Sequence, residues 1–135
     1  MDFFNAMDVS ASGLAVERAR MNAASSNLAN ASTTRTPEGG PYKRLDVVLE
    51  ATPVDGSATS FEAAVQGVLQ DSAAPRLEHD PSHPDADLAG NVAYPNVSVV
   101  EEMVDMITAS RAYEAGINAL RTAVSMAESA LGIGR

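Results

Sequence analysis

The chain has 135 residues, which is enough for one ordinary domain, and it carries a net charge of −9 at neutral pH. This acidic balance argues against a nucleic-acid-binding protein, which needs clustered basic side chains. The chain contains no Cys, so disulfide frameworks and thiolate sites are excluded. It contains no Trp and only 4% aromatic residues, a composition that favours helices packed on helices over a β-sandwich or barrel.

Neither a secretory signal nor a membrane span is indicated by the sequence pattern. Asp2 and Asp8 stand where a signal peptide needs basic residues. No apolar run approaches the roughly 20 residues that cross a bilayer. We therefore expect no direct membrane insertion and, if the protein leaves the cytoplasm, export without a cleaved signal.

The first predicted element is a helix from about Phe3 to Ala29. Its apolar stripe repeats every seven residues and consists of Met7, Leu14, Met21 and Leu28. The stripe is narrow, and Gly13 together with several Asn and Ser residues lowers the intrinsic helix propensity. We expect this helix to be marginal alone and to need a partner helix.

A polar joint is predicted after this helix, between Ser25 and Arg44. Its Ser and Thr side chains compete for backbone hydrogen bonds, and its Gly-Gly-Pro sequence turns the chain toward a strand. The residues expected to shape the joint are Asn27, Asn30, Thr33, Gly39, Gly40, Pro41 and Tyr42. Because the joint lacks acid–base groups, we expect it to face a subunit interface.

The middle of the chain predicts a small β region. Strands are predicted within residues 42–51 and 61–70, with a turn at Asp55-Gly56 between them and a short strand near Arg76–His79. Between Asp46 and Asp105 there are twelve acidic residues and one basic residue, Arg76. Such a region stays solvated or meets a basic partner.

The clearest pattern predicts a second helix from about Ser98 to Gly132, capped by Ser98 and followed by the sequence Leu-Gly-Ile-Gly, in which Gly132 and Gly134 allow a left-handed cap. Its apolar residues recur at alternating steps of four and three, which is typical of a coiled-coil seam. One row is Met103, Ser110, Ile117, Val124 and Leu131, and the other is Val99, Met106, Tyr113, Leu120 and Ala127. At about 50 Å, this helix is too long for a domain of this size to bury, so we expect part of the seam to meet another chain.

Two features of this helix admit more than one interpretation. Gly116 costs about 1 kcal/mol relative to Ala, so it indicates either close approach by a neighbouring helix or tolerated drift. Glu101, Glu102 and Asp105 lie in the first turns, where the helix dipole and solvent favour acids, so they need not form a catalytic pair.

Candidate catalytic and metal-binding residues gather only in the proline-rich connection. His79 and His83 are four residues apart, but intervening and following prolines prevent the helix on which such a pair shares zinc. A calcium-loop pattern beginning at Asp85 fails at two essential ligand positions. No nucleophile elbow or phosphate-binding glycine loop is present. We therefore expect no enzymatic activity, no cofactor and no bound metal.

Two long stretches resemble the signatures of the flagellar rod, hook and filament axial proteins. "GLAVERARMNAASSNLANASTTRTPEGGPYKR" is similar to their N-terminal signature, and "HPDADLAGNVAYPNVSVVEEMVDMITASRAYEAGINALRTAVSMAESALGIG" is similar to their C-terminal signature. The resemblance covers residues 10–50 and 75–134 and is strongest to a proximal-rod member. Gly116 is a departure, because similar proteins usually have Asn there.

These patterns predict an α+β fold in which long terminal helices pair as a coiled coil with a small β region between them. The expected units are residues 1–36 as the N-terminal rod helix and turn, 37–96 as the β region and proline-rich loop, and 97–135 as the C-terminal rod helix. The heptad residues of both helices are the expected subunit and helix-packing interface.

The resemblance implies a structural subunit of the bacterial flagellar basal-body rod, which spans the periplasm. The subunit would be exported from the cytoplasm by the flagellar type III system, polymerise in the proximal rod, and transmit torque from the inner-membrane ring to the distal rod and hook. Its partners would be other copies of itself, other rod proteins, the rod-base adaptor, the inner-membrane ring and the export apparatus. A soluble coiled-coil interaction module, or a small metal-dependent hydrolase using His79 and His83, are the alternatives left open.

Overall fold

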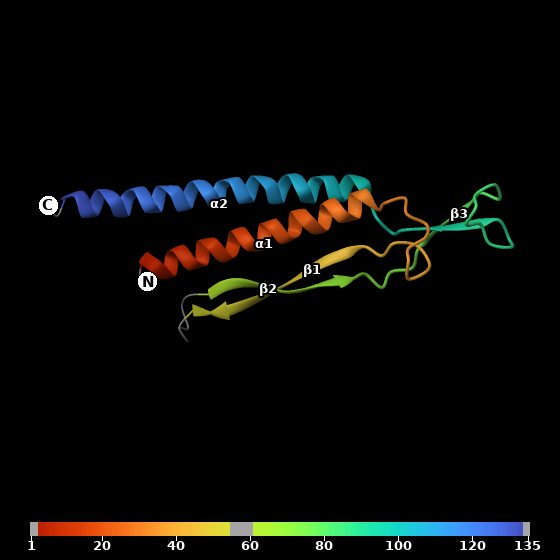
Figure 1. The fold of residues 1–135 in the computed structure, drawn as a ribbon, viewed down its shortest axis with the longest axis horizontal. Coiled ribbons are helices and arrows are strands. Elements are labelled where there is room, and N and C mark those ends of the chain that lie inside the picture. Colours follow the sequence, from red (N-terminus) through yellow and green to blue (C-terminus); the bar gives the residue numbers. More distant parts are fainter. Residues whose placement is uncertain (1–2, 55–60, 134–135) are drawn as a thin grey trace.

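The computed structural model describes residues 3–54 and 61–133 as one elongated molecule (Figure 1). In chain order its elements are α1 (Phe3–Ala29), β1 (Leu45–Pro53), β2 (Phe61–Gln70), β3 (Arg76–His79), β4 (Asn91–Tyr94) and α2 (Val99–Ile133). Within the described residues, these two helices and two small antiparallel sheets form the predicted α+β fold. The predicted turn at Asp55-Gly56 lies outside the described residues.

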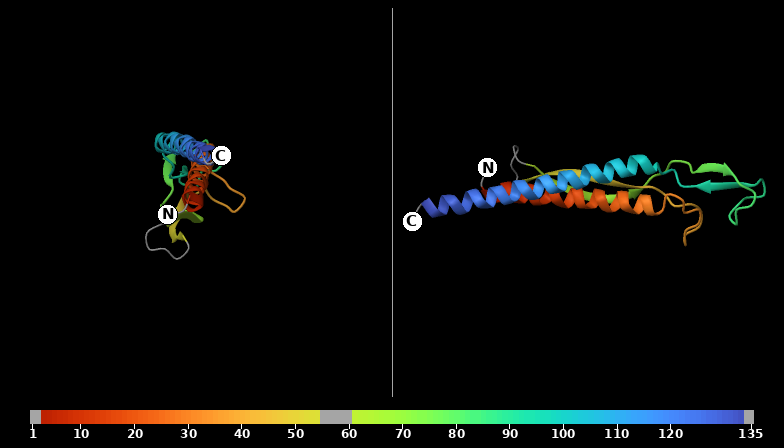
Figure 2. Two further views of the ribbon diagram at one scale, coloured as in Figure 1. Left: turned by 90° about the vertical axis from the view of Figure 1, so that its left-hand side faces the viewer. Right: turned by 90° about the horizontal axis from the view of Figure 1, so that it is seen from above.

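Helix α1 is the central layer of the molecule. It packs against α2 on one side and against the β1–β2 hairpin on the other (Figures 1 and 2). The two helices run antiparallel, and the C-terminal end of α2 extends past the start of α1. Covering α1 on two sides explains how a helix of low intrinsic propensity is held. Helix α2, in contrast, is covered by α1 on one side.

The β1–β2 hairpin pairs in antiparallel register from Leu45 opposite Gln70 to Pro53 opposite Phe61. The register shifts between Val48 and Leu49, a β-bulge that bends the hairpin and increases its twist. The hairpin is tied to α1 by the backbone N–H of Ala63, which donates to Ser12 Oγ at 3.2 Å.

The second sheet pairs β3 with β4, from Arg76 opposite Tyr94 to His79 opposite Asn91. Strand β3 was predicted from the sequence, whereas β4 was not. This hairpin projects from the end of the molecule opposite the start of α1 (Figure 1). Val92 of β4 and Pro95 are completely buried, and Val97, in the segment that leads into α2, is buried with 8% exposure.

The N-terminal end of α2 agrees with the prediction. Ser98 Oγ accepts a hydrogen bond from the backbone N–H of Glu101 at 3.5 Å, so the predicted cap is present. At the other end the helix continues through Gly132 to Ile133, so Gly132 does not end it; Gly134, the other glycine predicted to allow a left-handed cap, lies outside the described residues. Among the described residues, the glycines with positive φ are Gly39, Gly40 and Gly90.

Candidate functional site: the helix pair and its polar junction

Helix α2 turns a stripe of buried and half-buried positions toward α1. The stripe, at alternating steps of four and three, consists of Glu102, Met106, Ala109, Tyr113, Gly116, Leu120, Ala123 and Ala127. Its direction follows from two contacts: Glu102 accepts a hydrogen bond from Asn27, and Gly116 faces Leu14. A Cβ atom at Gly116 would lie 2.8 Å from Leu14 Cδ2, so glycine permits close approach of the helices there. The structure therefore favours the close-approach interpretation of Gly116.

The stripe overlaps only part of the two predicted rows. Its members from the predicted rows are Met106, Tyr113, Leu120 and Ala127. Ser110 and Ile117 are half-buried beside the stripe, whereas Val99, Met103, Val124 and Leu131 are exposed in the isolated chain. The face toward α1 is thus rotated by one residue relative to the row that begins at Met103. On α1, the predicted residues Met7, Leu14, Met21 and Leu28 are all half-buried.

A second apolar surface covers the first turns of α2, away from the stripe. We call it the outer patch, and it consists of Val99, Val100, Met103, Val104 and Ile107, all of which are exposed. Exposed Glu101 and Asp105 lie in the same turns, so the outer patch is an apolar surface bordered by charged residues. A contiguous exposed apolar patch with a polar rim is typical of an interaction surface.

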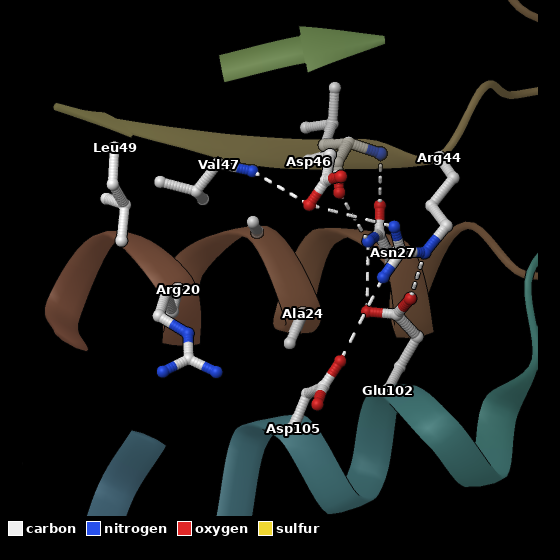
Figure 3. Close-up of a pocket in the computed structure, with 11 residues that line it drawn as sticks. Arg20, Ala24, Asn27, Arg44, Asp46, Val47, Leu49, Glu102 and Asp105 are labelled. Atoms are coloured by element: carbon white, nitrogen blue, oxygen red, sulfur yellow. Dashed lines mark hydrogen bonds and ion pairs between the residues drawn. The ribbon is translucent and has the colours of Figure 1, made fainter. Parts of the chain in front are cut away.

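Four polar residues from separate parts of the chain meet where α1 ends and α2 begins. This polar junction consists of Asn27, Tyr42, Arg44 and Glu102 together with the backbone of Leu45. Figure 3 shows Asn27, Arg44 and Glu102 of this junction. Asn27 is only 1% exposed and Glu102 only 2% exposed. Burial of such groups is costly unless every donor and acceptor is paired.

The side chain of Asn27 makes four hydrogen bonds, which is its full capacity. Its Nδ2 donates to Leu45 O and to Glu102 Oε2, each at 3.0 Å. Its Oδ1 accepts from Leu45 N at 2.8 Å and from Tyr42 Oη at 3.0 Å. The amide therefore pairs with the backbone of Leu45 much as a neighbouring strand would, and it connects α1 to both β1 and α2.

The buried carboxylate of Glu102 is neutralised by Arg44, whose Nε donates to Glu102 Oε1 at 2.6 Å. Longer ion pairs join Arg44 to Asp46 at 3.8 Å and to Asp105 at 3.9 Å. Burial works against the charge of Arg44, but the hydrogen bond and attraction to Glu102, helped by the two aspartates, outweigh it and raise its pKa above the usual value. Arg44 therefore stays charged, and it joins the residue just before β1 to α2.

The other joint residues shape the backbone between α1 and β1. Asn30 closes the helix, because its Nδ2 donates to Ser26 O at 2.9 Å while its Oδ1 accepts from Thr33 Oγ1 at 3.2 Å. Gly39 and Gly40 have φ angles of 91° and 76°, which favour glycine, and they precede Pro41. Tyr42 N donates to Thr33 O at 3.0 Å and closes the loop. The joint thereby delivers Tyr42 and Arg44 to the polar junction.

Sequence reasoning missed the part that Glu102 and Arg44 play in the junction. The expectation that Glu102 is solvated at the helix start is wrong, because the side chain is buried against Arg44 and Asn27. One feature of the sequence could have indicated that Glu102 faces α1: it lies seven residues before Ala109 and fourteen before Gly116, on the row of small residues.

The two histidines are placed in and beside the turn between β3 and β4. His83 Nδ1 accepts from Asp85 N at 3.1 Å, and His79 Nδ1 lies 3.2 Å from Asn91 Oδ1. Across residues 3–54 and 61–133, no cluster of three or more His, Asp or Glu side chains is arranged to hold a metal ion. In the same ranges, neither helix is apolar enough over sufficient length to cross a membrane.

Two family models of flagellar rod proteins match the chain, one near each end. The family model "Flagella basal body rod protein" matches residues 7–35, and "Flagellar basal body rod FlgEFG protein C-terminal" matches residues 88–133. These ranges contain most of α1, the start of the joint, β4 and all of α2.

Relatives named flagellar basal-body rod protein FlgC match along nearly the whole chain. The relative from Salmonella typhimurium is 40% identical over the full length of both chains. The relative from Borreliella burgdorferi is 39% identical and covers 98% of each chain. The relative from Aquifex aeolicus is 44% identical and covers 88% of this chain and 87% of its own. The chain belongs to the FlgC family of flagellar basal-body rod proteins.

Proposed function

We propose that the chain polymerises in the proximal rod and that the exposed apolar surface of its helix pair binds the neighbouring subunits. Family membership makes it a structural, non-enzymatic protein of the flagellar basal-body rod. The observation that carries the finer proposal is the outer patch, which includes Met103 at 48% and Val100 at 72% exposure. An apolar surface of this kind marks an interaction site in a folded protein.

The total surface of the chain supports the same proposal. The accessible area is 9063 Å² for a chain of 14.0 kDa. A compact monomer of that mass is expected to expose about 6,700 Å². The excess of roughly a third comes from the elongated shape, and it is comparable to the area that stable subunits bury in permanent interfaces. We propose that neighbouring rod proteins and other copies of this chain cover it, with the helix pair packing as a coiled coil.

The polar junction supports the proposal that the chain transmits mechanical force within the rod. Torque applied to one element has to pass to the others without sliding the helix pair. The hydrogen bonds of Asn27 and Arg44 connect α1, β1 and α2 at one point, so a force on α2 is shared by all three. We propose that this connection helps transmit torque from the inner-membrane ring to the distal rod and hook.

The small core supports export through the flagellar type III system. Among the described residues, the buried apolar side chains are Val16, Ala23, Ala24, Val92, Pro95, Val97 and Ala109, none of them larger than Val. A chain with so little buried apolar area is held only weakly in its folded form. We propose that it leaves the cytoplasm without a cleaved signal and folds fully at the rod, where it meets the rod-base adaptor, the inner-membrane ring and other rod proteins.

Single charges introduced into the outer patch test this function. Met103→Asp and Ile107→Asp place a carboxylate on an exposed apolar position, so the isolated chain keeps its helicity while subunit contacts are lost. We expect cells that carry either variant to be non-motile and their basal bodies to lack the rod. Thr108→Asp is the matched control, because it adds the same charge at a neighbouring exposed position outside the patch. Normal rods in both patch variants would contradict the proposal.

A further inference from the structure

We propose that the polar junction sets the register of the helix pair: it determines which heptad of α2 lies against which heptad of α1. Asn27, Arg44 and Glu102 are positioning residues in this proposal. Their main effect is to exclude helix pairs displaced by one heptad, and the apolar seam supplies the attraction between the helices.

The apolar seam alone distinguishes these registers only weakly. The stripe of α2 has a small residue every seven positions, at Ala109, Gly116 and Ala123. The stripe of α1 also repeats every seven residues, and its Leu14 faces Gly116. Displacing α2 by one heptad would bring Ala109 or Ala123 opposite Leu14. The added methyl group would meet Leu14 Cδ2, which is the end of a flexible side chain and can shift, so the penalty is modest. Because α2 extends beyond the start of α1, displacement in one direction also loses little overlap.

The polar junction has no such repeat. Glu102 lies on the stripe itself, and it receives hydrogen bonds from both Asn27 and Arg44. A displacement of one heptad moves Glu102 by about 10 Å along the helix axis. Arg44 and Asn27 would then lose their shared acceptor, and a buried donor without a partner is strongly unfavourable. A single polar contact in an otherwise apolar seam is known to specify register in coiled coils at some cost in stability.

The register has a consequence for assembly, which rests on the proposed function. The outer patch lies on α2, whereas the β1–β2 hairpin is packed on α1. A displaced pair would shift the outer patch relative to the hairpin by the same distance as the helices. Neighbouring subunits in a rod could then not contact both surfaces at once.

Engineered cysteine pairs measure the register directly, because the natural chain contains no Cys. The pair Leu14→Cys with Gly116→Cys reports the native register. The pairs Leu14→Cys with Ala109→Cys and Leu14→Cys with Ala123→Cys report displacement by one heptad in either direction. Disulfide formation needs Cβ atoms about 4 Å apart, which only facing positions satisfy.

The test compares these pairs in the native chain and in an Arg44→Met, Glu102→Met variant, which removes both junction charges together. In the otherwise native chain we expect the native-register disulfide to form at least tenfold faster than either displaced one. In the variant we expect that preference to fall to less than threefold while far-UV circular dichroism still shows the native helix content. Arg76→Met with Glu78→Met is the matched control, since it removes an exposed ion pair of the same composition.

Two results would overturn the proposal. One is a variant that keeps the native preference, since the seam would then define the register. The other is a variant that loses its helix content, since the junction would then be a source of stability. Rod assembly is measured separately, by the motility of cells that carry the Arg44→Met, Glu102→Met variant. Loss of the register preference with normal motility would leave the positioning role intact and contradict the proposed assembly surface.

Discussion

Replacing Asn27 with Asp is the sharpest perturbation of the polar junction, because it changes one NH₂ group to an oxygen and leaves the shape of the side chain unchanged. The replaced group donates to Leu45 O and to Glu102 Oε2, each at 3.0 Å. In the variant, an acceptor faces each of these acceptors, and one of them is a buried carboxylate. The two hydrogen bonds therefore become two repulsive contacts.

The expected loss in the free energy of unfolding is about 4 kcal/mol. Each acceptor left unpaired in a buried site costs roughly 1–3 kcal/mol, and an uncompensated buried charge costs about 3–5 kcal/mol. Small domains have a total stability of about 5–15 kcal/mol, so this loss is a large fraction of the total. Urea unfolding followed by far-UV circular dichroism measures the change as a shift in midpoint.

The sign of the pH dependence gives a second check on the Asn27→Asp variant. Burial beside Glu102 raises the pKa of the introduced carboxyl group above its unfolded value. Its protonated form is favoured in the folded state, so the deficit shrinks as pH falls from about 8 to about 5. Asn118→Asp is the control, since that residue is exposed and the change should stay within about 0.5 kcal/mol. A deficit below about 1 kcal/mol, or one that does not vary with pH, would refute the reasoning.

Three further predictions concern other parts of the molecule. Gly116→Val should destabilise the chain by about 1–3 kcal/mol, because the Cβ atom of the new side chain would meet Leu14. Leu14→Ala should relieve much of this loss. If the effects of the two substitutions are additive in a double-mutant cycle, the two residues are not in close contact. Hydrogen bonds from Ser82 lower the pKa of Asp80 below its usual 3.8. Hydrogen bonds to Asp87, of which the one from the Asn91 backbone has the largest effect, lower the pKa of Asp87 below the same value. The stability that these hydrogen bonds add is therefore fully present above pH 3.8 and is lost as pH falls through the lowered pKa values. The loss should appear as a change in the amide NMR shifts of Ser82 and Asn91. Amide shifts that stay constant down to about pH 2 would contradict this prediction. Finally, the isolated chain in dilute solution should show less helix than α1 and α2 contain and gain helix on assembly, and full helicity independent of concentration would disprove this.

The helices were the most predictable part of the fold. The range Phe3–Ala29 predicted for α1 is the range observed, and α2 begins one residue after its predicted cap. These segments have a sustained period and clear start signals, which depend on neighbours in the sequence. Strand β4 was missed because its four residues carry little pattern, and its pairing with β3 is a tertiary contact.

The facing of α2 and the polar junction could not be predicted for two physical reasons. Hydrophobicity gives weight to large residues such as Met103 and Leu131, whereas close packing against α1 uses small residues such as Ala109 and Gly116. Acidic residues at a helix start are ordinarily solvated, and the burial of Glu102 depends on Arg44, 58 residues away in sequence. Neither fact is visible in a local window of the chain.

Protection of the outer patch in assembled rods tests the central claim most directly. A Met103→Cys variant places the only thiol of the chain at the centre of the outer patch. If this surface binds neighbouring subunits, a maleimide reagent should label the thiol in the isolated chain, leave it unlabelled in intact basal bodies, and label it again after the rods are dissociated. Equal labelling in the isolated chain and in intact basal bodies would contradict the account.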